Sequence, residues 1–243
     1  MMLPIKGFIE NSLVEWEGKI TSVIFLPTCN FLCPYCHAPH LVKTPNELES
    51  IPLEAVVEKI RKSSGWIDGV VISGGEPTLH KRLDELLALF KDMEILTRLD
   101  TNGTNPSVLE NLLSEGLLDC IAMDIKAPLR KEIYERVAGI PCNIDDIQES
   151  ICTIMESGIE YEFRTTVCPT QLTEENIVDI VKAIKGAKRY IIQSFKPNHC
   201  LDKRMLTVLP YPIETLREFA LIAREYVDYC CVRGEEGKIL LRN

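Results

Sequence analysis

Short apolar, β-branched runs alternate with helical patterns about six times along this chain of 243 residues. The runs have the length of buried strands, and the segments between them place apolar residues three and four positions apart. Such alternation predicts right-handed crossovers and a parallel sheet. Six units are too few for the usual closed eight-stranded barrel. We therefore expect an α/β fold whose parallel sheet is doubly wound or curved into part of a barrel.

The pattern also predicts where each element lies and how many domains the chain has. No internal repeat, low-complexity tract or linker marks a boundary, so residues 1–243 are expected to form a single domain. The expected strands cover 20–26, 69–73, 95–100, 120–125, 161–167 and 190–195, with 229–232 as a late edge strand. The expected helices cover 53–62, 81–91, 107–113, 131–137, 145–155, 174–184 and 213–226.

The unusual residues gather where these predicted strands end. In parallel α/β sheets, ligand chemistry collects at the carboxyl ends of the strands. A cysteine loop follows the first strand, a GGEP turn the second, DTNG the third and DIK the fourth. The candidate binding residues at these ends are Gly74, Gly75, Glu76, Pro77, Asp100, Thr101, Asp124 and Lys126, to which strands five and six add Arg164 and Gln193.

Three of the ten cysteines, Cys29, Cys33 and Cys36, lie within eight residues of one another. A cubane iron–sulfur cluster ligated by only three cysteines keeps one iron open for a small molecule. The alternative for this loop taken alone is zinc, because His37 and His40 stand beside Cys36 and a Cys3His site is a known structural arrangement. The strand-end turns favour the cluster, since a structural zinc loop has no need of them.

Composition limits the partners and the compartment. The chain has 27 Lys and Arg against 36 Asp and Glu, a net charge of −9, which argues against nucleic acid or an anionic membrane as partner. The N-terminal segment carries Glu10, Glu15 and Glu17 where a secretory signal must be apolar. We expect a cytoplasmic protein whose thiols stay reduced. The other cysteines are expected to be small buried hydrophobic residues: Cys120, Cys142, Cys152, Cys168, Cys200, Cys230 and Cys231.

The C-x3-C-x2-C loop, with Tyr35 before its third cysteine, resembles that of the radical S-adenosylmethionine (SAM) enzymes. The segments GFIENSLVEWEGKITSVIFLPTCNFLCPYCHAP, SGGEPTL, DTNG, MDIKAP and EFRTTVCP together resemble the activating proteins of glycyl radical enzymes. Among these, they are similar to the anaerobic ribonucleoside-triphosphate reductase activating proteins, in the form that resembles pyruvate formate-lyase activase. The resemblance implies a partial (β/α)6 barrel and a [4Fe-4S] cluster on Cys29, Cys33 and Cys36.

The resemblance also implies roles for the strand-end residues. The GGEP turn, Gly74 to Pro77, would receive the methionine amino group of SAM. Asp100, Thr101, Asp124 and Lys126 would surround its carboxylate and ribose, positions at which pyruvate formate-lyase activase also holds a monovalent cation. Arg164 needs an anionic partner because a guanidinium in mid-strand is buried, and a ligand carboxylate would serve. Gln193 and Tyr35 complete the expected cofactor site.

The implied reaction is reductive cleavage of SAM to a 5′-deoxyadenosyl radical, which takes hydrogen from a glycine of a partner enzyme. The partner implied is an anaerobic ribonucleotide reductase. The chain has no second cysteine-rich run near residues 40–70, so its electron must come from an external donor such as flavodoxin or ferredoxin. Ala38 departs from the family pattern, which often has Asn there. The alternatives are radical chemistry on a small molecule, as in deazaguanine synthases, and a non-enzymatic iron–sulfur or zinc module.

Overall fold

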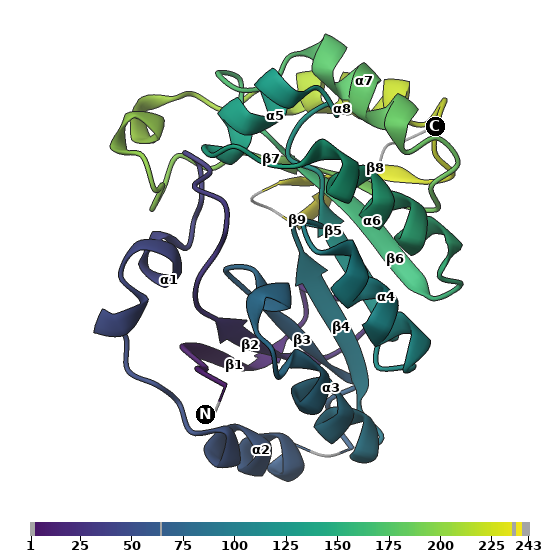
Figure 1. The fold of residues 1–243 in the computed structure, drawn as a ribbon. Coiled ribbons are helices and arrows are strands. Elements are labelled where there is room, and N and C mark those ends of the chain that lie inside the picture. The colour runs from purple at the N-terminus through teal and green to yellow at the C-terminus, as the bar shows by residue number, and fades with distance from the viewer. Residues whose placement is uncertain (1–2, 64, 235–236, 240–243) are drawn as a thin grey trace. The chain divides into compact units, whose positions relative to one another are not determined.

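The strands of the protein follow one another across an open, mostly parallel sheet. The structure is a computed structural model that describes residues 3–63, 65–234 and 237–239 (Figure 1). The sheet order is the order of the chain, β1 to β9. The strands are β1 (Gly7–Ser12), β2 (Thr21–Leu26), β3 (Gly69–Gly74), β4 (Leu96–Thr101), β5 (Cys120–Asp124), β6 (Glu160–Val167), β7 (Tyr190–Ser194), β8 (Cys230–Gly234) and β9 (Gly237–Ile239).

Helices connect the parallel strands, as the sequence pattern predicts, and the α/β fold class is confirmed. Within the described residues, no helix combines the length and the apolar character needed to cross a bilayer. The helices are α1 (Pro39–Lys43), α2 (Leu53–Lys62), α3 (Leu83–Asp92), α4 (Pro106–Ser114), α5 (Lys131–Ala138), α6 (Ile144–Glu156), α7 (Glu174–Ala183) and α8 (Ile213–Ala223), with short 3-10 helices η1 (Pro45–Glu47), η2 (Pro77–Leu79) and η3 (Lys203–Thr207).

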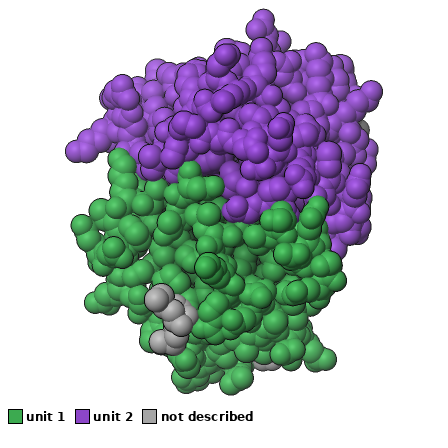
Figure 2. Space-filling view, viewed as in Figure 1, with its two compact units in different colours: residues 1–30, 38–101, 107–121 green, residues 31–37, 102–106, 122–243 purple. Residues whose placement is uncertain are grey.

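The chain divides into two compact units, coloured green and purple in Figure 2. Unit 1 comprises residues 1–30, 38–101 and 107–121, and unit 2 comprises residues 31–37, 102–106 and 122–243. The cysteine loop is shared between them, because Cys29 belongs to unit 1 whereas Cys33 and Cys36 belong to unit 2.

Unit 1 is built on β1 to β4. Strand β1 pairs antiparallel with β2, while β2, β3 and β4 run parallel, with Thr21 beside Gly69 and Gly69 beside Leu96. Helix α2 packs against β1 and α3 packs against β4. The inner residues of β3, Val70, Val71 and Ile72, are completely buried, as expected of a parallel strand covered on both faces.

Unit 2 is built on β6 to β9. Strands β6, β7 and β8 run parallel, and β9 returns antiparallel to β8. Helix α8 packs against β7 and β8, and α7 packs against α8. Helix α7 begins with a capping box in which Thr173 and Asn176 bond each other's backbone, which satisfies N–H groups at the start of the helix.

The structure corrects three expectations. Strand β1 has no predicted counterpart, because its mixed sequence, GFIENS, lacks a strict alternation of polar and apolar residues. The expected edge strand at 229–232 is β8, which is not at the edge, since β9 pairs with its other side. The scattered cysteines are not all buried, because Cys142 is partly exposed and Cys152 is exposed on α6.

The carboxyl ends of β2 and β3 approach each other so closely that only glycine fits. Gly75 N donates to Leu26 O and Glu76 N donates to Thr28 O, each at 2.8 Å. A Cβ on Gly74 would lie 2.2 Å from Leu26 O, and one on Gly75 would lie 1.9 Å from Thr28 O. We call this contact the glycine clasp: residues 26–28 against residues 74–76. It fixes the position of Thr28, directly before Cys29.

Gly75→Ala should destabilise the protein, because its new Cβ would overlap the Thr28 carbonyl and one of the two strand ends must move. The expected loss in free energy of unfolding is about 3 kcal/mol, the upper range for overpacking. Gly158→Ala is the matched control: its φ of +79° disfavours alanine, but nothing lies within 4 Å of the new Cβ, so about 1 kcal/mol is expected. Denaturant unfolding measures both. Equal losses would show that the clasp tolerates a side chain.

Candidate functional site

Backbone hydrogen bonds hold the second part of the cysteine loop, residues 31–37, in unit 2. Cys36 N donates to Cys33 O at 3.0 Å, which closes a turn between two of the candidate ligands. Leu32 N donates to Ala138 O at 2.8 Å, at the end of α5. On the other side, Leu201 N donates to Cys36 O and Asp202 N donates to Pro34 O, at 3.0 and 2.9 Å. These backbone hydrogen bonds therefore hold the segment in place, and neither Cys33 nor Cys36 forms a disulfide.

The first cysteine follows a residue that unit 1 holds in an unusual conformation. Thr28 has a φ of +70°, which non-glycine residues rarely adopt. Its N–H donates to Leu41 O at 2.8 Å, and its carbonyl accepts from Glu76 in the glycine clasp. His80 Nε2 contacts Pro27 O at 2.8 Å. Cys29 therefore begins from a chain position fixed by three separate segments.

Asp124, at the end of β5, is paired with two cations of unit 2. Arg164 Nε donates to Asp124 Oδ1 at 2.8 Å, and Lys126 Nζ donates to Oδ2 at 2.9 Å. The Arg164 side chain is 7% exposed and that of Asp124 is 29% exposed. The anionic partner that a buried Arg164 requires is thus supplied by the chain. Two positive charges face one carboxylate, so the cluster keeps a net positive charge that suits an anionic ligand group.

These charges shift the pKa values of the cluster. Burial alone would raise the pKa of the Asp124 carboxyl, but Arg164 and Lys126 outweigh burial and hold that pKa well below its usual value. Burial would lower the pKa of the Lys126 ammonium, but Asp124 reverses this effect and raises it well above its usual value. All three side chains are therefore charged at neutral pH.

Tyr35 connects the cysteine segment to this cluster. Its side chain is buried and its hydroxyl makes no hydrogen bond within the described residues. Burial first, and then the Cys33 thiol, raise the pKa of Tyr35 well above its usual value, and Lys126 acts in the opposite direction. Lys126 also interacts electrostatically with Cys33. Within unit 2, four side chains therefore lie close enough to affect one another's pKa values or charges: Cys33, Tyr35, Asp124 and Lys126.

In unit 1, Asp100 lies at the end of β4 with partners that the sequence pattern did not single out. Arg98 Nε donates to Asp100 Oδ1 at 3.1 Å, and Ser73 Oγ donates to Oδ2 at 3.3 Å. Arg98 is 1% exposed and Asp100 is 8% exposed. The sequence does contain a signal for the Arg98–Asp100 pair. Arg98 interrupts an apolar run and lies two residues before Asp100, and residues two apart on a strand point to the same face.

Glu76 of the GGEP turn is completely buried. Its Oε1 accepts hydrogen bonds from Thr78 N at 3.1 Å, Thr78 Oγ1 at 2.6 Å and Thr101 Oγ1 at 2.8 Å. Thr101 was predicted to contact a ligand; here its hydroxyl is used to hold Glu76. The Glu76 carboxylate therefore ties the end of β3 to the end of β4.

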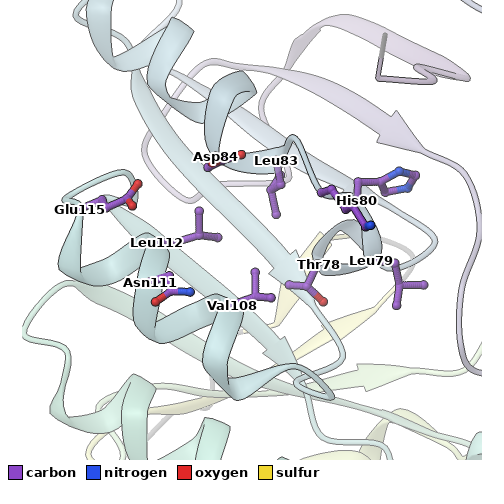
Figure 3. Close-up of a pocket in the computed structure, with 10 residues that line it drawn as sticks. Thr78, Leu79, His80, Leu83, Asp84, Val108, Asn111, Leu112 and Glu115 are labelled. Carbon is purple, nitrogen blue, oxygen red and sulfur yellow. The ribbon is translucent and has the colours of Figure 1, made fainter. Parts of the chain in front are cut away.

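A pocket of about 260 Å³ adjoins this turn, between η2, the start of α3 and α4. Figure 3 shows Val108 and Leu112 of α4 across from Leu83 and Thr78, with His80 beside η2. Thr78 and His80 connect the pocket to Glu76 and Pro27 respectively. None of the predicted binding residues lines this pocket.

Two further candidate residues, Gln193 and His37, form hydrogen bonds within unit 2. Gln193 lies beside Thr166 across β6 and β7, and its Oε1 accepts from Thr166 Oγ1 at 3.3 Å. His37 Nε2 contacts Lys196 O at 2.8 Å, so this ring nitrogen is hydrogen-bonded to a backbone carbonyl. Tyr134 was also missed by sequence reasoning: its hydroxyl accepts from Lys126 N at 3.3 Å, and its ring meets Phe31 edge-on.

Asp124→Asn should lower the free energy of unfolding by about 2 kcal/mol at neutral pH, because it leaves Arg164 and Lys126 without their carboxylate. A lowered pKa makes this contribution fully present above the ordinary Asp value of about 4 and lost as the pH falls through the lowered one. The difference from wild type should thus persist at pH 5 and shrink in stronger acid.

Denaturant unfolding at several pH values measures this difference. Asp202→Asn is the matched control, because its partner Arg204 is 90% exposed and exposed pairs contribute little. A difference between wild type and Asp124→Asn that disappears already between pH 7 and pH 5 would contradict the ion-pair assignment.

Comparisons with known proteins identify the family. A profile of the Radical SAM superfamily matches residues 23–185. A protein of Methanocaldococcus jannaschii named "Putative glycyl-radical enzyme activating enzyme MJ1227" is 34% identical over 96% of this chain and 97% of its own. The pyruvate formate-lyase-activating enzyme of Clostridium pasteurianum is 28% identical over 78% of this chain and 79% of its own.

The solved structures support the same fold. Streptococcus suis SuiB bound to precursor peptide SuiA superposes with a TM-score of 0.65 and 18% identity, over 88% of this chain and 48% of the SuiB chain. This chain thus spans about half of SuiB, and the likeness concerns the fold alone. Together with the open parallel sheet, it confirms the expected partial (β/α)6 barrel. The family implies a [4Fe-4S] cluster and SAM as cofactors. The chain therefore belongs to the radical SAM superfamily, and it is an enzyme with relatives named as glycyl-radical enzyme activating enzymes.

Proposed function

We propose that this protein reductively cleaves SAM and generates a glycyl radical on a partner enzyme, with anaerobic ribonucleoside-triphosphate reductase as the partner. The observation that carries the activase assignment is the match along 96% of the chain to a relative named as a glycyl-radical enzyme activating enzyme. The assignment of the reductase rests on the sequence segments that resemble its activating proteins. We also propose that residues 1–243 form a single radical SAM core domain.

The donor chemistry of the cysteine loop fits the cluster. Within the described residues, no group of three or more His, Cys, Asp or Glu side chains is already arranged around a metal position. Cys29, Cys33 and Cys36 nevertheless lie on one loop and form no disulfide, and thiolates are the ligands that iron–sulfur clusters take. Zinc with His37 is less favoured, because His37 Nε2 is engaged by Lys196 O. We propose these three cysteines as the cluster ligands.

The charged and polar residues at the strand ends suit the carboxylate and amino groups of SAM. The cluster, when bound, supplies the electron that breaks a carbon–sulfur bond of SAM and yields the 5′-deoxyadenosyl radical. Lys126 and Arg164 would hold the methionine carboxylate, since they exceed Asp124 by one charge. The turn Gly74–Pro77 would receive the amino group, while Asp100, Thr101, Tyr35 and Gln193 would complete the site. A monovalent cation would compete with the chain's own cations for Asp100 and Asp124.

Buried aromatic side chains at the cysteine segment would help to exclude water from this chemistry. Phe31 of that segment meets Tyr134 of α5 edge-on, and both are buried, as is Tyr35. These aromatic side chains form a wall of low dielectric constant, which strengthens the ion pair of Lys126. By excluding water, such a wall also prevents side reactions of a radical. The partner glycine must therefore enter on a flexible loop, which glycine permits because it lacks a side chain.

A protein partner is supported by the segment that follows β7. Residues 196–202 bond the cysteine segment through Leu201 and Asp202. The chain then continues into η3, where Leu206 is 43% exposed, and on to Leu209, which is 83% exposed. Exposed apolar side chains next to a reactive loop are typical of protein interaction sites. We propose this segment as part of the docking surface for the glycyl radical enzyme.

The electron donor and the compartment follow from the same proposal. With three clustered cysteines and one cluster, the chain has no relay of its own, so a flavodoxin or ferredoxin is proposed as the reductant. A reducing cytoplasm is proposed as the compartment, because it keeps free thiols available as ligands.

Anaerobic reconstitution should give about four irons per chain, as expected for one cubane cluster. Cys29→Ala, Cys33→Ala and Cys36→Ala should each remove the cluster, because each deletes one of only three proposed ligands. Cys142→Ala is the matched control, since Cys142 is a partly exposed thiol outside the loop. Iron, sulfide and zinc content measure the result. One equivalent of zinc, or equal loss of iron in Cys142→Ala, would overturn the ligand assignment.

The function is tested by mixing the reduced protein with SAM and the anaerobic ribonucleotide reductase of the same organism. A glycyl doublet in the electron paramagnetic resonance spectrum, together with 5′-deoxyadenosine, is the expected result. The Cys33→Ala variant should give neither product. If 5′-deoxyadenosine forms but no glycyl enzyme of the organism yields a doublet, the activase proposal is wrong and a small-molecule substrate becomes the better explanation.

A further inference from the structure

We propose that Arg98 is a built-in counter-ion for Asp100, so that this chain binds SAM without any monovalent cation. Arg98 is assigned here as a positioning residue: it acts on the cofactor site only through Asp100. The inference rests on the proposed function as far as SAM binding, and it does not depend on which partner receives the radical.

The Arg98–Asp100 pair is contained within unit 1 and is almost completely buried. The Arg98 side chain is 2% exposed and the Asp100 side chain is 9% exposed, with Nε and Oδ1 at 3.1 Å. The second carboxylate oxygen accepts from Ser73 Oγ at 3.3 Å. Both oxygens of Asp100 are therefore directed to groups of the chain, and its negative charge is balanced by a guanidinium.

The placement of this guanidinium follows from the strand. Arg98 and Asp100 are two residues apart on β4, so their side chains lie on the same face. A buried guanidinium is costly unless a carboxylate pairs with it. Because a guanidinium stays charged throughout the accessible pH range, the compensation of Asp100 does not vary with conditions as the binding of a free ion would.

Asp124, the other acidic candidate of a cation site, is compensated separately within unit 2. Its two oxygens accept from Arg164 and Lys126 at 2.8 and 2.9 Å. Alkali cations bind oxygen ligands, and here the carboxylate oxygens already face fixed positive charges. An added ion at either carboxylate would be repelled by the cation beside it. The residues present therefore do not fit the monovalent cation that the resemblance allows for.

A purely structural ion pair and a built-in counter-ion predict different behaviour when Arg98 is removed. If the pair only supports β4, losing Arg98 weakens the fold equally in every salt. If Arg98 replaces a cation, its loss leaves Asp100 with an uncompensated charge, and an external ion can then restore SAM binding. Cation-specific rescue therefore separates the two roles.

The experiment measures SAM affinity by calorimetry on the anaerobically reconstituted protein, in potassium, sodium or tetramethylammonium chloride at equal ionic strength. Wild type and Arg98→Lys, which keeps the charge, should agree across the three salts to within about twofold. Arg98→Met should lose about tenfold or more in tetramethylammonium and regain most of this in potassium or sodium. Arg82→Met is the matched control, because Arg82 pairs with Glu85 at the start of α3 and both side chains are about half exposed.

The double variant Arg98→Met with Asp100→Asn keeps the proposal testable if Arg98→Met alone folds poorly. It removes both charges together, so its SAM affinity should again be independent of the salt. A wild-type affinity that depends on potassium or sodium would overturn the proposal. So would a loss in Arg98→Met that is the same in all three salts, or a double variant that still requires the ion.

Discussion

The glycine clasp is the contact on which the candidate site depends. Two backbone hydrogen bonds join residues 26–28 to residues 74–76, at a separation that admits no Cβ. The segment before Cys29 and the turn that carries Glu76 are thereby set by a single contact. The Glu76 carboxylate in turn accepts a hydrogen bond from Thr101 Oγ1, which ties the end of β4 to the same turn. Three strand ends are thus aligned before any cofactor binds, which is the sense in which a site is preorganised.

Electrostatic balance is the second theme of the structure. Asp100 and Asp124 each meet a buried or partly buried arginine from their own unit, and Lys126 adds one more positive charge. Because burying a lone charge costs far more than burying a pair, these contacts let carboxylates occupy strand ends that also contain apolar walls. They leave a positive excess beside Cys33 and Tyr35, where an anionic ligand group and a thiolate-bound cluster can both be accommodated.

Much of the fold follows from the sequence because buried parallel strands and amphipathic helices have distinct periodicities. Strands β2 to β7 appear within a residue or two of their predicted bounds, and α2 matches its predicted bounds. Strand β1 was missed because its antiparallel edge position imposes no apolar run. In the candidate site, the sequence located the strand ends but did not show which charged side chains form pairs. The partners of Asp100 and Arg164 depend on side-chain direction and distance, which only the folded chain defines.

The backbone anchoring of residues 31–37 has a consequence for how this loop can vary. Its carbonyl and amide groups, not its side chains, make the hydrogen bonds to Ala138, Leu201 and Asp202. Any residue other than proline can supply those groups at positions 32, 201 and 202. An exposed side chain of the loop, such as Leu32 at 41% exposed, is therefore not needed to shape it, whereas the buried Phe31 and Tyr35 are constrained by their packing. Such exposed positions can be altered to tune the specificity of the site while the three thiols keep their places.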